Sequence, residues 1–406
     1  MYTFFEDHCT SNDIITMEQA GGKKGSWGCT DQLLINKMVL EEVTTNRRNL
    51  FTMWFDYKKA FDTIAHDWLI KALELTKLPT KLINVVKMLM QKWSVIVSLN
   101  HSEGNIETEV ITYLNGLLQG GCLSLILFEL CINPLSHLLN DLPGYKLGKP
   151  GERTTNLSHL FFVDDLKTFA TDEKAARMQL DLITIFTNDI GMEFGADKCA
   201  YLRIQKGERK SLGSTIEING LQLSELKEGE SYKYLGMDED IAIKGEINKE
   251  KVRSEYFRRI RKIWNSELYC RYKVTAHNTF AIPVLTPTFG ILSWSKEELK
   301  QIDVKTRKPL LLSGSFHQNS DVDRLYCHRS EGGRGLNSVD DTYVSRIVSL
   351  NLHLDQVEQS NKYLAQVKIH EQRNIVRQGL EFQQTYSEET VSDPKIASKN
   401  IDENQK

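Results

Sequence analysis

Two adjacent carboxylates lie between apolar residues at positions 160–166, where the sequence is L-F-F-V-D-D-L. This pattern predicts a β-hairpin with buried strands that presents Asp164 and Asp165 at its turn. Neighbouring carboxylates repel each other unless a cation compensates them. A third carboxylate nearby would complete a set of oxygen ligands suited to Mg²⁺. By itself an Asp-Asp pair is also common in surface turns, because Asp favours turn backbones.

A candidate third carboxylate, Asp56, directly follows another apolar stretch, L-F-T-M-W-F at residues 50–55. Active-site ligands are commonly presented at the carboxyl end of a buried strand. Apolar spacing from Trp68 to Leu73 predicts a helix soon afterwards. Asp56 is therefore equally compatible with a helix N-cap.

Three further stretches carry groups that could bind a substrate. Residues 116–124, G-L-L-Q-G-G-C-L-S, lead into an apolar helix, and Gln119 offers an amide that can contact a base or sugar. An ordinary helix entry is the alternative. Lys198 lies in a predicted turn, either as an ammonium near a pyrophosphate leaving group or as a solvated lysine. Residues 18–28 are predicted to form a Gly-rich basic loop, followed by a helix that Thr30 or Asp31 caps. The loop could bind phosphate, although its sequence does not match a P-loop.

From about residue 245 the predicted structure becomes helical. One helix combines an apolar stripe with cationic residues, as a surface that follows a sugar-phosphate backbone requires. A merely solvated face is the alternative. The cationic residues are Lys249, Lys251, Arg253, Arg258, Arg259, Arg261 and Lys262.

The remaining elements are predicted from apolar periodicity and turn residues. Helices are expected at 82–92, 174–190, 276–292 (broken by Pro283 and Pro287), 296–312 and 342–380. Strands are expected around 94–99, 109–114, 200–204, 215–218 and 232–235. Roughly the last 20 residues are polar and are expected to be disordered.

Composition limits the possible classes of protein. A chain of 406 residues should divide into two or three domains. The formal charge of −3 means that nucleic-acid binding must depend on local basic patches. Seven scattered cysteines without a C-x-x-C pair argue against a zinc finger or disulfide framework. The first residues lack a signal-peptide pattern, and the apolar run at 120–132 is too short to span a bilayer. A soluble intracellular protein, in the nucleus or cytoplasm, is expected.

Taken in order, these motifs resemble the reverse transcriptase of non-long-terminal-repeat (LINE-type) retrotransposons, from about Glu18 to about Leu336. D-Y-K-K-A-F-D at 56–62, followed by His66, is similar to the first catalytic strand of the family. Q-G at 119–120 with L-S at 123–124 and L-F at 127–128 resembles its helix entry, and F-V-D-D at 162–165 its catalytic turn. Gly191 with D-K at 197–198, and Y-K-Y-L-G at 232–236, resemble the next two motifs. Five motifs in sequence are far more specific than any one.

The resemblance implies an α+β fold, a right-hand polymerase palm with partial fingers and a helical thumb. Partial fingers would occupy residues 1–55 and the palm with inserted fingers helices 56–245. The helical thumb would occupy 246–340, a C-terminal helical extension 341–385 and a disordered tail 386–406.

The implied activity is RNA-directed DNA polymerase, which adds deoxynucleoside triphosphates to a DNA primer on an RNA template, with no membrane involved. Asp56, Asp164 and Asp165 would bind two Mg²⁺ ions, with Mn²⁺ as a substitute, and Lys198 would protonate pyrophosphate. The nucleotide would be contacted by Tyr57, Phe61, Gln119 and Gly120, with Phe61 excluding a ribose 2′-hydroxyl. Nucleic acid would be contacted by Lys23, Lys24, Arg253, Arg258, Arg259, Arg261 and Lys262.

The sequence also departs from the family pattern. Gly121, Cys122 and Leu125 replace the D, P and second P of the usual Q-G-D-P-L-S-P. The fingers arginine that clamps the triphosphate, a nuclease and a zinc-knuckle pattern are not found, so a fragment or decayed copy is expected. Two alternatives follow, a catalytically inactive nucleic-acid-binding remnant of a retrotransposon and a maturase-like partner of an intron.

Overall fold

The computed structural model describes residues 2–102, 104–148 and 154–386. The chain divides into two units, which are described separately. Unit 1 comprises Met1–Gln32 and Glu41–Leu235, and unit 2 comprises Leu33–Leu40 and Gly236–Lys406. Helix α2 (Cys29–Thr45) therefore contributes residues to both units.

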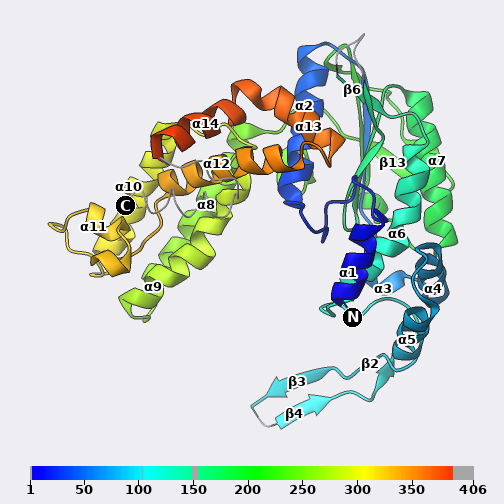
Figure 1. Ribbon diagram of the computed structural model, residues 1–406, viewed down its shortest axis with the longest axis horizontal. Coiled ribbons are helices and arrows are strands. Elements are labelled where there is room, and N and C mark those ends of the chain that lie inside the picture. The colour runs from blue at the N-terminus through cyan, green and yellow to red at the C-terminus, as the bar shows by residue number, and fades with distance from the viewer. Residues whose placement is uncertain (1, 103, 149–153, 387–406) are drawn as a thin grey trace. The chain divides into compact units, whose positions relative to one another are not determined.

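A seven-stranded sheet forms the centre of unit 1, in the order β12-β13-β10-β1-β9-β8 with β11 beside β10 (Figure 1). The β10–β13 pair is parallel and the other pairs are antiparallel. The strands are β1 (Leu50–Phe55), β8 (His159–Phe162), β9 (Asp165–Ala170), β10 (Ala200–Gln205), β11 (Glu208–Arg209), β12 (Ile216–Ile218) and β13 (Leu221–Glu225).

Strand β1 is central in this sheet, and all six of its residues are buried. Alternate residues from Phe51 to Phe55 join the main core cluster with side chains of α6 (Ser124–Asn140) and α7 (Glu173–Asp189). Successive side chains point to opposite faces of a strand, so Trp54 faces away from these helices, where it stacks on Tyr232 at 4.8 Å. Burial on both faces explains why this strand is apolar without alternation.

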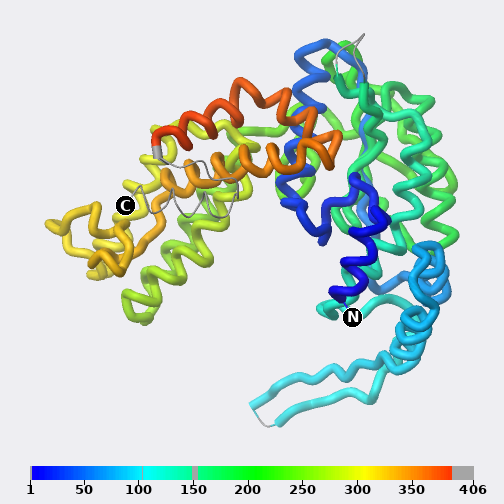
Figure 2. Tube along the Cα trace, in the orientation of Figure 1, coloured from blue at the N-terminus to red at the C-terminus, as the bar shows by residue number. Residues whose placement is uncertain are grey.

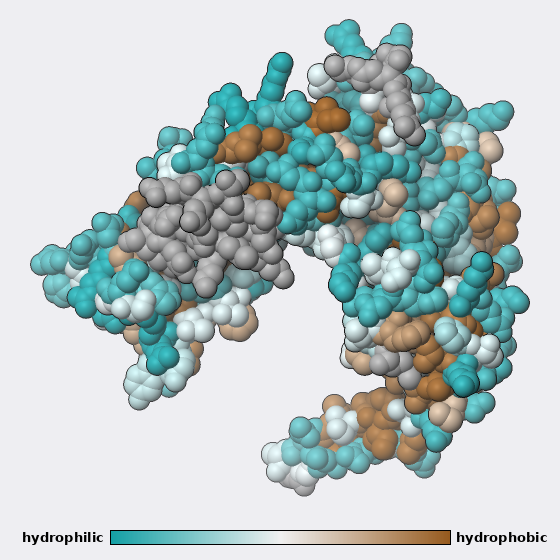
Figure 3. Space-filling model, in the orientation of Figure 1, coloured by the Kyte–Doolittle hydropathy of each residue, from teal (hydrophilic) through white to brown (hydrophobic). Residues whose placement is uncertain are grey.

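Shorter elements complete unit 1. An extended two-stranded arm, formed by the pairs β2–β5 and β3–β4, follows α5 (Thr80–Met90), as the cyan part of the trace shows (Figure 2). Apolar surface covers part of this arm (Figure 3), and Ile96, Val97 and Val110 are exposed on it. The helices are α1 (Tyr2–Ser11), α3 (Ala60–Thr63), α4 (His66–Leu75) and α5 (Thr80–Met90), and the strands are β2 (Ser94–Val95), β3 (Ser98–His101), β4 (Gly104–Glu107), β5 (Ile111–Thr112), β6 (Tyr145–Leu147), β7 (Thr155–Leu157) and β14 (Tyr232–Tyr234).

Unit 2 is mainly helical. Helix α10 packs against both α8 and α12, and α12 packs against α14. The elements are β15 (Met237–Glu239), α8 (Gly245–Trp264), α9 (Cys270–Ala276), α10 (Lys296–Leu312), α11 (Asp323–Tyr326), α12 (Val339–Val357), α13 (Lys362–His370) and α14 (Ile375–Tyr386). Among the described residues, no helix is long and apolar enough to cross a membrane.

Several predicted boundaries differ from the structure. Helix α2 begins at Cys29 after Gly28 and has no side-chain cap, so the predicted caps Thr30 and Asp31 are wrong. The helix predicted at 276–292 is instead a π-helical turn followed by 3-10 turns, because Pro283 and Pro287 cannot donate to a regular helix. The helix predicted at 342–380 divides into α12, α13 and α14. Apart from Tyr386, the tail predicted at 386–406 lies outside the described residues.

Candidate active site

Strands β8 and β9 form the predicted hairpin, and Val163 and Asp164 form its two-residue turn. Phe162 pairs with Asp165, so Asp165 is the first residue of β9 rather than part of the turn. Val163 has a φ of 58°, a conformation that is rare for a β-branched side chain. Backbone strain of this kind persists only where the surroundings hold it, and it is concentrated at functional sites.

Asp56 lies beside this hairpin. Strands β1 and β9 pair with Phe55 opposite Leu166, so Asp56, the residue directly after β1, is level with Asp165. Asp56 caps no helix, since the N-cap of α3 is Lys59. The alternative interpretation of Asp56 is therefore wrong, and three carboxylates meet at one end of the sheet.

The three carboxylates destabilise one another electrostatically. Burial, and then the charges of Asp164 and Asp56, raise the pKa of Asp165 to about 6. Burial also raises the pKa of Asp164, and the charge of Asp56 adds to the effect. A bound cation would relieve this repulsion, and carboxylate oxygens are preferred ligands of Mg²⁺ and Mn²⁺. The donor set fits a divalent metal ion.

Lys198 supplies a positive charge at the edge of this site. Its Nζ lies 3.1 Å from Oδ2 of Asp56, and its side chain is 63% exposed. The hydrogen bond and the charge of Asp56 raise the pKa of Lys198, so it stays an ammonium at neutral pH. The backbone N–H of Gly195 donates to the Asp56 carbonyl at 2.8 Å, which holds the Lys198 turn against the end of β1.

Two of the residues predicted to contact the nucleotide follow Asp56 closely. Phe61, in α3, is half-buried and stacks on Phe128 with ring centroids 4.5 Å apart. Tyr57 is buried, stacks on Phe194 at 4.9 Å and lies 3.4 Å from the Thr187 hydroxyl. Its side chain belongs to the core, so the predicted nucleotide contact of Tyr57 would have to come from its backbone.

Gln119 and Gly120 are exposed in the loop before α6, where a ligand could reach them. The start of this loop is bound to the segment that carries Phe61. The Leu117 N–H donates to the Phe61 carbonyl and the Gly116 N–H to the Ile64 carbonyl, each at 2.7 Å. Nε2 of His66 also donates to the Gly116 carbonyl at 2.9 Å. His66 thus connects two of the motifs that the sequence could only place in order.

The Gly-rich loop does not present both of its lysines to a ligand. Lys23 is half-buried, and its ammonium donates to the carbonyls of Ile15 and Thr16 at 3.0 and 3.2 Å. Lys24 is exposed and lies 3.8 Å from Asp7. Lys23 therefore stabilises its own loop, contrary to the prediction that its ammonium contacts nucleic acid, whereas Lys24 faces solvent.

Helix α8 carries the predicted cationic residues, but most of them already have acidic partners. Lys249 is buried, and it shares Glu298 with Arg253. Arg258 and Arg259 both pair with Glu255, at 2.6 and 2.8 Å. Lys251 pairs with Asp238. No ion pair is found for Arg261 or Lys262 in the part of the chain that the structure describes, so the uncompensated charge of α8 lies towards its C-terminal end.

Sequence reasoning missed the residues that support the Val163–Asp164 turn. Gln19 and Gly21 lie in the loop that was predicted to bind phosphate, yet both contact Val163. An amide followed by glycines is only a local signal of a flexible loop. Nothing local could indicate a partner 144 positions later in the chain.

Comparison with known proteins places this geometry in a family. Residues 10–238, more than half of the chain, match the family model described as "Reverse transcriptase (RNA-dependent DNA polymerase)". The "Retrovirus-related Pol polyprotein from type-1 retrotransposable element R2" of Nasonia vitripennis is 22% identical over 215 residues, which cover 52% of this chain and 20% of that protein. The polyprotein of the same description from Popillia japonica is 25% identical over 189 residues, 45% of this chain and 29% of that protein. This chain therefore spans well under half the length of these curated relatives.

Among solved structures, apo telomerase from Candida tropicalis aligns with 90% of this chain and 59% of its own, at 10% identity and a TM-score of 0.42. The carboxylate triad at the end of three antiparallel strands, β8, β9 and β1, agrees with the family match in sequence, which includes all three aspartates. The resemblance to a LINE-type enzyme and the predicted right-hand polymerase fold are confirmed by these findings. The chain belongs to the reverse transcriptase family.

Proposed function

We propose that this chain is an RNA-directed DNA polymerase that adds deoxynucleotides to a primer 3′-hydroxyl. One observation carries the proposal, namely that Asp56, Asp164 and Asp165 meet at the ends of adjacent strands. When bound by these carboxylates, two Mg²⁺ ions would lower the pKa of the 3′-hydroxyl and stabilise the charge of the transferred phosphoryl group. Because the substrates are nucleic acids, the proposed place of action is inside the cell, in the nucleus or cytoplasm.

The protein's own side chains would orient the nucleotide and move a proton. Lys198, which remains protonated beside Asp56, would donate a proton to the departing pyrophosphate oxygen. Phe61, held by its stack on Phe128, would exclude a ribose 2′-hydroxyl. Gln119 and Gly120 would contact the incoming nucleotide from the exposed loop before α6.

Unit 2 would hold the RNA template and DNA primer through a basic groove between α8 and α10. The groove has a volume of about 620 Å³. It is lined by four cationic side chains and one acidic side chain, Glu250. The cationic residues are Arg253, Arg261, Lys305 and Lys308. Contacts between cations and phosphates position a duplex without reading its sequence, which suits a polymerase that copies any template.

Primer extension on an RNA template with Mg²⁺ tests the catalytic proposal. We expect the wild-type chain to extend the primer with deoxynucleotides and Asp164→Asn to abolish extension, because the substitution removes a metal-binding charge without changing side-chain size. Asp67→Asn is the matched control, since Asp67 is an exposed aspartate of α4 outside the triad. Extension by Asp164→Asn at the wild-type rate would contradict the proposal.

A second candidate is a nucleic-acid-binding remnant without catalysis. The basic groove supports it, because cationic side chains can bind phosphates without any metal-binding carboxylate. The replacements Gly121, Cys122 and Leu125 at the helix entry favour it as well. Filter binding of the same primer–template, measured beside extension, separates the candidates, since the remnant would bind without extending the primer.

A further inference from the structure

Gln19 contacts the catalytic turn through both ends of its side-chain amide. Its Oε1 accepts hydrogen bonds from the backbone N–H groups of Val163, at 2.9 Å, and Gly21, at 3.0 Å. Its Nε2 donates to the Val163 carbonyl at 3.2 Å. Gln19 is only 3% exposed, so water does not compete strongly for these bonds. Both backbone groups of Val163 are therefore bonded to one side chain.

Val163 requires such support because its backbone is strained. Its φ of 58° is a conformation that a β-branched residue adopts only at a cost in free energy. The loop also approaches the turn so closely that a Cβ at Gly21 would lie 2.5 Å from Cγ2 of Val163. The turn conformation thus depends on the loop that covers it.

The main-chain hydrogen bonds between this loop and β8 end at Phe161, two residues before Val163. The Phe161 N–H donates to the Glu18 carbonyl at 2.9 Å, and the Ala20 N–H donates to the Phe161 carbonyl at 3.1 Å. A second buried amide, Nε2 of Gln32, donates to the same two carbonyls, at 2.8 and 2.9 Å. Gln32 therefore supports the edge of β8, whereas Gln19 reaches the turn itself.

We propose that Gln19 is a positioning residue that holds the Val163–Asp164 turn in its strained conformation and thereby sets the metal affinity of the triad. This inference rests on the proposed function, because it assumes that the triad binds divalent metal. Residues that orient metal ligands typically affect metal affinity or activity by about 10–100-fold. Gln19 touches no carboxylate and acts through the backbone of the turn.

The test is Mn²⁺ binding, followed by the electron paramagnetic resonance signal of the free ion, on the full chain and three variants. We expect Gln19→Ala to weaken Mn²⁺ binding by about 10-fold or more. The matched control Gln32→Ala removes an equally buried amide from β8 and should retain the wild-type affinity. Adding Val163→Gly to Gln19→Ala should restore most of the affinity, because glycine adopts a positive φ without strain.

Primer extension on the same samples separates this inference from the proposed activity. We expect Gln19→Ala to lower kcat while the KM for primer–template stays unchanged. Weaker Mn²⁺ binding in Gln19→Ala supports the inference even if the wild-type chain extends no primer. Three results overturn it, namely wild-type affinity in folded Gln19→Ala, an equal loss in Gln32→Ala, or no recovery in the double variant.

Discussion

Asp165 combines partial burial with two neighbouring carboxylates, which makes its ionised form unfavourable in the folded chain. Its pKa of about 6, against an ordinary value of 3.8, means that the folded chain retains a proton that the unfolded chain loses between these pH values. The stability associated with this proton is present below about pH 4 and is lost as the pH rises through about 6. At neutral pH the ionised, metal-free site therefore weakens the fold.

Substituting Asp165→Asn should consequently stabilise the metal-free chain while removing the proposed polymerase activity. At pH 7.5 in chelator we expect a gain of about 1–2 kcal/mol, after allowing for partial exposure of the group. At pH 4 the gain should disappear, because the wild-type carboxyl is then largely protonated. Urea unfolding at the two pH values measures the difference, and an equal gain at both would contradict the electrostatic explanation.

Glu129 of α6 is a second buried carboxyl with a raised pKa. Burial raises its pKa to about 8, and the charge of Lys23 opposes this only in part. Its contribution to stability is therefore lost as the pH rises through 8. We expect the wild-type melting temperature to fall between pH 7 and pH 9 and Glu129→Gln to reduce that fall. Thermal unfolding across this range is the measurement, and parallel curves for the two proteins would rule out Glu129 as the cause.

At the scale of elements, the segment that carries Phe61 and the loop that carries Gln119 form one bonded assembly. Their main-chain bonds require Gly116 to approach the backbone of Asp62 closely. A Cβ at Gly116 would lie 2.6 Å from the Asp62 carbonyl oxygen, and the glycine has a φ of 83°. Phe61 and Gln119, which we propose contact the nucleotide, would in this way share one support.

Gly116→Ala should therefore be strongly destabilising. We expect a loss of more than about 2 kcal/mol, since a backbone overlap adds to the strain of positive φ. Gly191→Ala is the matched control, because Gly191 has a φ of 74° but open space around its Cβ, and only about 1 kcal/mol should be lost. Chemical denaturation of both variants measures this. Equal losses would show that φ alone, rather than the contact with Asp62, limits the position.

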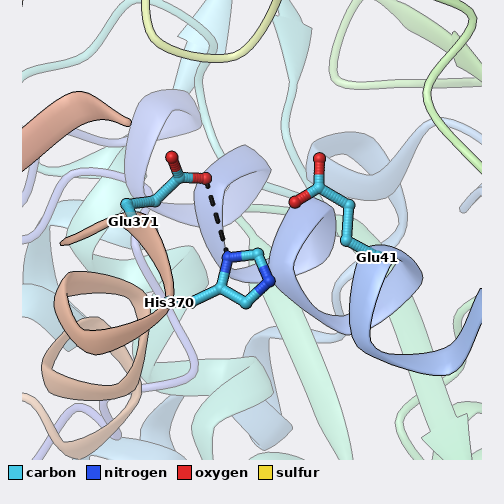
Figure 4. Close-up of side chains that lie close together, drawn as sticks. All are labelled: Glu41, His370 and Glu371. Atoms are coloured by element: carbon cyan, nitrogen blue, oxygen red, sulfur yellow. Dashed lines mark ion pairs between the residues drawn. The ribbon is translucent and has the colours of Figure 1, made fainter. Parts of the chain in front are cut away.

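At the scale of the whole molecule, stability depends on contacts between residues that are distant in sequence. Lys37 of α2 and Glu371, which follows α13, are 334 positions apart and form an ion pair of 2.7 Å with side chains 9% and 4% exposed. Nδ1 of His370 lies 3.7 Å from Oε1 of Glu371 (Figure 4). Burial alone would raise the pKa of Glu371, but the neighbouring His370 and the charge of Lys37 lower it to about 2.

Removing one partner of this ion pair should cost more than removing both. Lys37→Met leaves a buried uncompensated carboxylate, and we expect a loss of about 3–5 kcal/mol. The double variant Lys37→Met with Glu371→Leu should regain much of this loss, because no charge remains buried. A double-mutant cycle by urea unfolding at pH 7 tests the prediction, and additive losses would show that the two side chains do not interact.

Much of the fold follows from local patterns in the sequence. The β8–β9 hairpin is predicted by apolar strands around an Asp-Asp pair, and α10 has the predicted bounds, Lys296–Leu312. The structure shows why that helix begins there, with a capping box between Ser295 and Glu298. Such patterns depend on residues that are close together in the sequence, so the elements they specify can be predicted without knowing the tertiary contacts.

The sequence by itself determined the family, the three carboxylates and the order of the motifs, because these depend on residue types and spacing along the chain. Only the tertiary structure decided which of those residues are available to a ligand. Tyr57 and Lys23 are engaged inside unit 1, and much of the charge on α8 is compensated by acidic partners. The conformation of the Val163–Asp164 turn also depends on tertiary contacts, because the strained Val163 is bonded to Gln19 of a distant loop. Burial and pairing depend on partners far away in the chain, so local patterns do not reveal them.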